Sequence, residues 1–111
     1  MKNLIVIISK DFLPIIDLEQ FNYIIVRNNY ELIDHDCLLL NNEKLYFDYL
    51  IIDNLEAAKK LDLLIEEPYV VTNAFLETST ERIFAFGDIV LNLKPKDEQL
   101  RMILEYIKNP Y

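Results

Sequence analysis

Glycine is almost absent from this chain: of its 111 residues, only Gly87 is a glycine. Loops that hold the phosphates of a nucleotide usually need several glycines, because the backbone must turn tightly and approach the ligand closely. In a dinucleotide-binding fold such a loop follows the first strand. Here the first apolar run, residues 3–9, continues into Lys10, Asp11 and Phe12. The sequence therefore predicts that the usual glycine-loop mode of phosphate binding is lost.

The chain is also acidic, with a formal net charge of −8. Nucleic-acid binding depends on clustered Lys and Arg side chains that contact phosphates, but the only adjacent basic residues are Lys59 and Lys60. We therefore expect no binding to nucleic acid or to anionic membranes. No apolar run approaches the ~20 residues of a membrane span, and the N-terminal run is too short for a signal peptide. These features favour a cytoplasmic location.

Short apolar runs separated by turn signals predict a small α/β fold. Uninterrupted isoleucine-rich runs are typical of parallel strands that are buried on both faces. The runs expected to form strands are residues 3–9, 21–27, 30–34, 37–40, 48–52, 69–72 and 83–86. Residues 11–18, with Pro14, are expected to be a connection. Residues 1–111 are thus predicted to form one domain, a layered and mostly parallel sheet with a β-meander and two or three helices.

Two helices are expected from their apolar periodicity. The first follows Asp53 and Glu56, whose spacing fits a capping box in which the aspartate caps and the glutamate reaches back. Its apolar face is expected to be Ala57, Leu61, Leu64 and Ile65, with Pro68 beyond its end. The second follows Pro95 and is expected to bury Leu100, Ile103, Leu104 and Ile107 and to stop at Pro110.

Residues 77–89 carry a pattern that points to a known family. This segment, which ends in Gly87, Asp88 and Ile89, resembles the C-terminal flavin-site motif of the pyridine nucleotide-disulfide oxidoreductases, the thioredoxin reductase and NADH oxidase group. Residues 42–52 resemble the strand that passes the flavin in the same family. The resemblance implies a reduced FAD/NAD(P)-binding-like fold. It also implies that Gly87 would let the chain approach FAD and that Asp88 would hold the ribityl or pyrophosphate part.

Departures from the family pattern fall on the positions nearest the cofactor. Residues 53–55 replace the family's Ala-Thr-Gly, and residues 81–82 replace its Pro-Gly. Phe86 stands where the family has a small residue and is expected to push into the flavin space. Leu100, Met102 and Ile103 replace small residues of the last helix, and the single cysteine excludes a Cys-x-x-Cys redox pair. We therefore expect no bound cofactor, with FAD at Gly87 and Asp88 as the alternative.

The other candidate residues have structural interpretations. Asp88 is expected to cap the turn after its strand by accepting from nearby backbone N–H groups. His35 lies between Asp34 and Asp36, but strand neighbours point to opposite faces, so a metal site is not expected. Cys37 is expected to be a buried small apolar residue. No residue is singled out as catalytic.

The favoured hypothesis is a non-catalytic, thioredoxin reductase-related domain that acts through protein–protein association, as a homo-oligomer or with a protein partner. Loss of the cofactor loop and its helix is expected to leave sheet surface uncovered, and such surface is normally buried by association. A surplus of aromatic residues, at positions 12, 21, 23, 30, 46, 47 and 49, favours an interface as well. The alternatives are an FAD-dependent oxidoreductase subunit whose phosphate-binding loop comes from another chain, and a pocket for a small neutral ligand.

Overall fold

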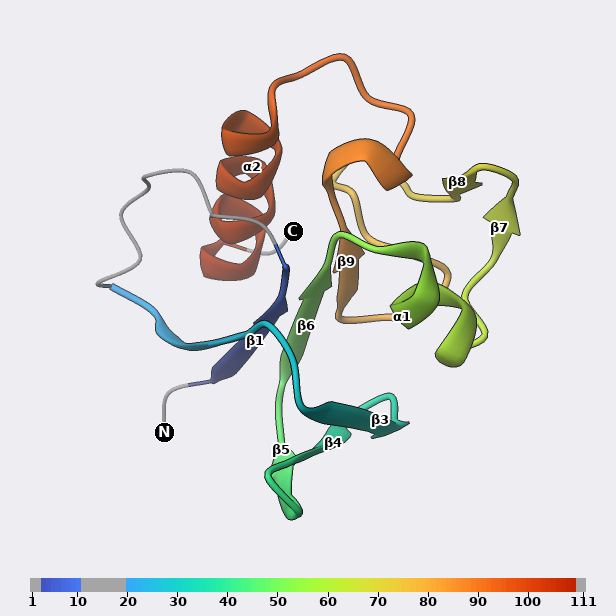
Figure 1. Ribbon diagram of the computed structural model, residues 1–111. Coiled ribbons are helices and arrows are strands. Elements are labelled where there is room, and N and C mark those ends of the chain that lie inside the picture. The colour runs from blue at the N-terminus through green and yellow to red at the C-terminus, as the bar shows by residue number, and fades with distance from the viewer. Residues whose placement is uncertain (1–2, 11–19, 110–111) are drawn as a thin grey trace.

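The computed structural model describes residues 3–10 and 20–109 and shows an α/β fold (Figure 1). A parallel sheet has the strand order β2-β1-β6-β9, an antiparallel meander has the order β3-β4-β5, and β7 and β8 form a small hairpin. The strands are β1 (Leu4–Ile8), β2 (Asn22–Val26), β3 (Tyr30–Asp34), β4 (Cys37–Leu40), β5 (Glu43–Tyr46), β6 (Tyr49–Ile52), β7 (Ile65–Glu66), β8 (Tyr69–Val70) and β9 (Ile83–Ala85). The helices are α1 (Leu55–Lys60), the 3-10 helix η1 (Gly87–Ile89) and α2 (Lys96–Lys108). The predicted fold class is confirmed.

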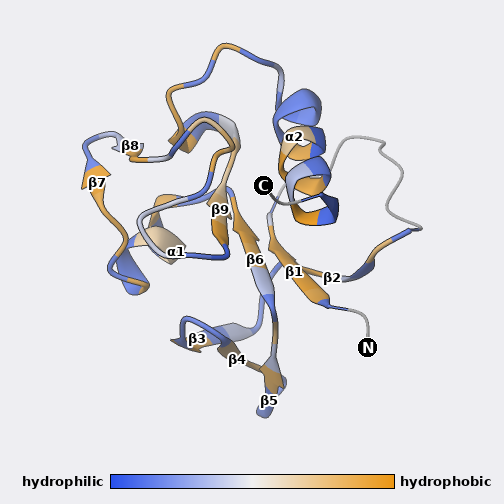
Figure 2. Cartoon of the chain, turned by 180° about the vertical axis from the view of Figure 1, so that it is seen from behind, coloured by the Kyte–Doolittle hydropathy of each residue, from blue (hydrophilic) through white to orange (hydrophobic). Residues whose placement is uncertain are grey.

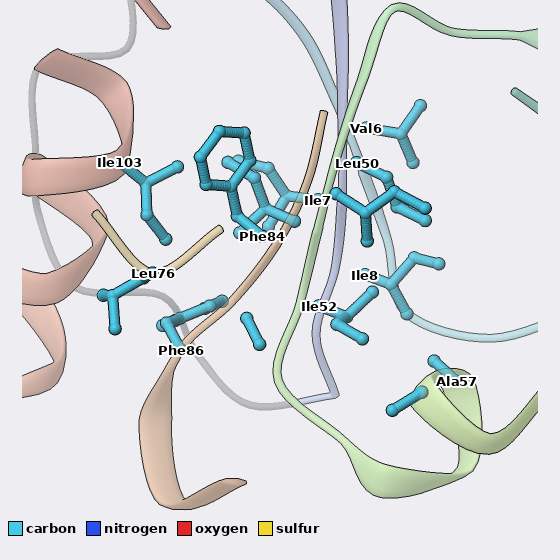
Figure 3. Close-up of a cluster of buried hydrophobic side chains, with 14 of the residues drawn as sticks. Val6, Ile7, Ile8, Leu50, Ile52, Ala57, Leu76, Phe84, Phe86 and Ile103 are labelled. Carbon is cyan, nitrogen blue, oxygen red and sulfur yellow. The ribbon is translucent and has the colours of Figure 1, made fainter. Parts of the chain in front are cut away.

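The central strands β1 and β6 are covered on both faces, as their unbroken apolar runs predict. Ile5 to Ile8 of β1 and Leu50 to Ile52 of β6 are at most 1% exposed. Figure 3 shows Ile103 of α2 and Ala57 of α1 on opposite sides of these strands. The expectation of an uncovered sheet face is therefore wrong for β1, β6 and β9, because α2 covers one face while α1 and the meander cover the other.

Helix α2 packs on the sheet through the four apolar residues predicted for it. Leu100, Ile103, Leu104 and Ile107 are all buried. Asp97 and Glu98 lie in its first turn and Lys108 lies in its last, where each charge suits the helix dipole. Figure 2 shows the hydrophobic strands beside α2 and the more hydrophilic outer side of that helix. Pro14 and Pro110, expected in a connection and at a helix stop, lie outside the described residues.

The meander is held in register by two short turns. The β4–β5 turn consists of Asn41 and Asn42, whose φ angles are 53° and 66°. A two-residue hairpin turn with positive φ at both positions suits asparagine, which tolerates the left-handed region. The turn is limited to these two residues, because Glu43 and Lys44 already pair with β4. Leu38 of β4 is fully buried, so the meander contributes to the common core.

Helix α1 differs from its prediction at both ends. Its N-cap is Asn54, whose side-chain oxygen accepts from the backbone N–H of Ala57 at 2.9 Å, and not Asp53. Its last residue is Lys60, so the predicted face ends early, and Ile65 instead pairs in the β7–β8 hairpin. Asp62 adopts a φ of 57°, which an α-helix does not accommodate. In the described part of the chain, no helix is long and apolar enough to cross a membrane.

Candidate functional site

Gly87 lies at the carboxyl edge of the parallel sheet, where open α/β sheets place their ligands. It follows β9 and begins η1, and its φ is 82°, in the region that favours glycine. A side chain at this φ would strain the backbone, so the turn itself favours glycine. Its backbone N–H donates to Oε1 of Gln99 at 2.7 Å. The turn is thus fixed by a side chain from α2.

The space beside Gly87 is occupied by other side chains of the same chain. A β-carbon at this position would lie 3.5 Å from Cε of Lys96 and 3.7 Å from Cβ of Asp53. These are ordinary van der Waals distances, so a group larger than a methyl would have to displace the Lys96 side chain to approach the backbone here. The resemblance predicts that FAD packs against Gly87. In this structure the side chains of Lys96 and Asp53 pack there instead.

Ser9, Asp53 and Lys96 form a compact polar cluster at this edge. Ser9 follows β1 and Asp53 follows β6, so adjacent parallel strands deliver both side chains to one place. The Ser9 hydroxyl donates to Oδ2 of Asp53 at 2.6 Å, and Nζ of Lys96 lies 3.2 Å from the same oxygen. The Asp53 side chain is 6% exposed and that of Lys96 is 32% exposed. The ammonium of Lys96 also lies 5.4 Å from the centre of the Phe86 ring, a cation–π distance.

The chemistry open to this cluster is limited by its burial. Ser9 is fully buried and its hydroxyl is already hydrogen-bonded to a carboxylate, so it offers no exposed nucleophile. Asp53 is matched by a cation and a hydroxyl donor, which is the arrangement that makes a buried carboxylate tolerable. The arrangement is that of a structural ion pair.

The predicted projection of Phe86 into an open flavin space is wrong, because its side chain lies in the core. The side chain is fully buried, and it shares the α2 side of β9 with Phe84, two residues earlier (Figure 3). Leu100 and Ile103 of α2 are likewise buried. These large residues fill the core between the sheet and α2.

Asp88 is exposed and makes no hydrogen bond or ion pair with any described residue, so its predicted role as a turn cap is wrong. Gln99 performs that role instead. Besides accepting from Gly87, its side chain donates to the backbone carbonyl of Lys94 at 2.8 Å, and it is only 3% exposed. In the sequence, Gln99 is visible only as a polar residue beside the apolar Leu100 of the last helix, and nothing there indicates that it would bind the turn at Gly87.

His35 and Cys37 both belong to the β3–β4 part of the meander, and Cys37 is buried as predicted. His35 is exposed in the β3–β4 turn, and its Nε2 lies 3.1 Å from the backbone oxygen of Leu61. Cys37 is 4% exposed. The described residues contain no group of three or more His, Cys, Asp or Glu that could hold a metal ion.

Tyr30 of β3 has a hydroxyl group whose pKa is changed by its surroundings. Burial raises the pKa of its hydroxyl above the ordinary value of 10.0. The Asn54 side chain lowers this pKa in part, and the carboxylates of Glu56 and Asp53 raise it. Because the raised pKa belongs to the folded state, folding favours the neutral phenol. The associated stability is present at neutral pH and is lost as pH rises through the folded pKa.

Alkaline unfolding tests this assignment of Tyr30. We expect the free energy of unfolding to fall above about pH 10, and to fall less steeply in Tyr30→Phe, which cannot ionise. Urea unfolding at several pH values measures both profiles, and Tyr46→Phe, at an exposed position on β5, is the control. Parallel profiles for the wild type and Tyr30→Phe would contradict the shift.

Comparison with known proteins gives weak structural similarity only. No family model matches the chain, and no curated protein matches it. Among solved structures, reduced CoADR-RHD of Bacillus anthracis is similar with 14% identity and a TM-score of 0.42, over 96% of this chain and 29% of that one. A ferredoxin-flavin thioredoxin reductase from Clostridium acetobutylicum is similar with 14% identity and a TM-score of 0.33, over 97% of this chain and 51% of that one. The chain thus spans about a third to a half of these proteins, and at these scores the similarity identifies no family.

Proposed function

We propose that this chain is a non-catalytic, cytoplasmic domain, related to the thioredoxin reductase group, which binds no flavin and acts by associating with a second copy of itself. The observation that carries the proposal is the ion pair between Lys96 and Asp53 that packs beside Gly87. There, Lys96 and Asp53 occupy the space that the resemblance assigns to FAD.

The charges at this edge also oppose a dinucleotide. A diphosphate is normally held by backbone N–H groups and a helix N-terminus. Here the N–H of Gly87 is already bonded to Gln99, and Lys96 is paired with the buried Asp53. The exposed carboxylate of Asp88 adds a further negative charge. A diphosphate would have to displace these contacts and accept repulsion from two carboxylates.

Exposed apolar side chains support association. Leu91 and Leu93, in the segment between η1 and α2, are 78% and 104% exposed. Of the aromatic residues expected to mark an interface, Tyr23 and Tyr46 are exposed, whereas Phe47 is buried and Phe12 lies outside the described residues. Since β1, β6 and β9 are covered, we place the association surface near Leu91 and Leu93 and not on the faces of these three strands.

The purified protein is expected to be colourless, to leave the absorbance and fluorescence of added FAD unchanged, and to self-associate at micromolar concentration. Visible spectra, a flavin titration and analytical ultracentrifugation measure these properties. A flavin absorbance band in the purified protein would overturn the non-catalytic assignment. A monomer at every concentration would overturn self-association.

One observation favours the second candidate, an FAD-dependent oxidoreductase subunit that receives its phosphate-binding loop from another chain. Gly87 keeps its positive φ, and the neighbouring Asp88 carboxylate is exposed without a partner among the described residues. In such a complex both residues would contact FAD. Co-expression with the proteins encoded by neighbouring genes tests it: a yellow complex that contains this chain supports the second candidate, and a colourless one removes it.

A further inference from the structure

The outer face of α2 carries a groove of about 600 Å³. Its floor is apolar and consists of Phe75, Met102 and Tyr106. The rings of Phe75 and Tyr106 stack with their centroids 4.7 Å apart, and Met102 lies one helical turn before Tyr106. Phe75 is 39% exposed, so part of this aromatic surface faces solvent. The floor therefore lies against the C-terminal half of α2.

The same groove has a charged rim whose signs alternate along the chain. Lys94, Glu98, Arg101 and Glu105 line it in that order. None of these four side chains forms an ion pair or a hydrogen bond with another described residue. The rim thus presents two positive and two negative charges that are available to a partner.

The sequence of charges along this rim is positive, negative, positive, negative, so a second copy running in the opposite direction places a negative charge opposite each positive one. If a second copy of α2 lies antiparallel across the groove, with a two-fold axis between residues 99 and 100, Glu98 faces Arg101 of the partner subunit. Lys94 then faces Glu105 of the partner subunit. A parallel arrangement in register would instead place Glu98 against Glu98 of the partner subunit, and like charges in contact oppose association. Charge complementarity therefore selects the antiparallel second copy.

The exposed leucines fit the same arrangement. Leu91 and Leu93 precede the N-terminus of α2, whereas the apolar floor lies at its C-terminal half. In an antiparallel pair, the segment before one α2 lies over the C-terminal half of the other. Each copy then supplies an apolar projection and an apolar groove, as a two-fold symmetric interface requires.

From these observations we infer that a second copy of this chain docks antiparallel on the α2 groove, with its segment before α2 covering Phe75, Met102 and Tyr106. This inference rests on the proposed self-association and specifies its surface. The contact is small, so association on the order of micromolar is expected. At physiological salt a screening length of about 8 Å weakens repulsion between the two acidic copies more than it weakens the contact pairs.

Charge swaps across the two-fold axis test the inference. Glu98→Arg and Arg101→Glu each place like charges in contact twice, so each is expected to raise the dissociation constant about tenfold or more. The double variant Glu98→Arg/Arg101→Glu restores both pairs and should return to within about threefold of the wild type. A mixture of the two single variants also restores both pairs and should form the heterodimer.

Sedimentation equilibrium from about 1 to about 100 µM measures these constants. The controls are Glu43→Arg and Lys44→Glu, which make the same charge changes at exposed positions on β5 and should leave the dimer unchanged. Circular dichroism checks that each variant is folded. Where a helix variant is misfolded, Leu93→Asp replaces it, since Leu93 lies outside every helix and strand.

The outcomes separate this inference from the proposed function. A wild-type dimer that is weakened by the single swaps and restored by the double swap and by the mixture supports the surface. A wild-type dimer that the folded single swaps or Leu93→Asp leave unchanged overturns the surface and keeps self-association. A wild-type monomer at all concentrations overturns both.

Discussion

Replacing Phe86 by alanine is expected to lower the free energy of unfolding by about 3 to 5 kcal/mol, the usual cost of removing a fully buried aromatic ring. Phe86 is 0% exposed, and its ring lies in the core on the α2 side of β9. Its loss removes apolar contacts and leaves a cavity that the parallel strands do not collapse to fill. Because small domains have a total stability of about 5–15 kcal/mol, the effect is large.

Urea unfolding followed by circular dichroism measures this change. Tyr46→Ala on β5 is the matched control, because that ring is 62% exposed and its loss is expected to change stability by no more than about 0.5 kcal/mol. A Phe86→Ala variant within about 1 kcal/mol of the wild type would contradict the burial of Phe86 between sheet and helix.

Lys96→Met is expected to lower the free energy of unfolding by about 2 kcal/mol, because it leaves the buried Asp53 carboxylate without its cation. Breaking a fully buried ion pair costs about 3–5 kcal/mol. Lys96 is partly exposed, so solvent screening reduces that figure. Methionine retains most of the aliphatic stem, and the change therefore isolates the charge.

The Lys96→Met measurement has an exposed ion pair as its control and Asp53→Asn as the second mutation of a double-mutant cycle. Lys59→Met breaks the ion pair between Lys59 and Glu67, whose side chains are 60% and 66% exposed, and should have no measurable effect. In an Asp53→Asn background the charge at Asp53 is gone, so Lys96→Met should cost about 1 kcal/mol less than in the wild type. Equal costs in the two backgrounds would show that Lys96 stabilises the fold by packing alone.

The parallel sheet and α2 could be predicted from local patterns. A strand buried on both faces must be apolar at every position, and β1 and β6 show this directly in their isoleucine-rich runs. A helix that packs on one face must repeat apolar residues every three or four positions, as α2 does. These constraints act between near neighbours and are therefore visible in the chain itself.

The start of α1 could not be assigned in the same way. Asp53 and Asn54 are adjacent and both are good N-cap residues. Asn54 caps the helix because the carboxylate of Asp53 is bound to Ser9 and Lys96 across the sheet edge. Two tertiary contacts thus decided between two locally equivalent candidates.

The sequence by itself determined that a positive φ is available at low cost at one glycine, Gly87, and that the chain lacks a glycine-rich phosphate loop. Only the tertiary structure decided what occupies the space beside that glycine. Ser9 and Asp53 are 44 residues apart and meet because β1 and β6 pair in parallel, while α2 brings Lys96 to the same edge. The spacing of such residues in the chain carries no periodic signal, because strand pairing and helix packing set their contacts.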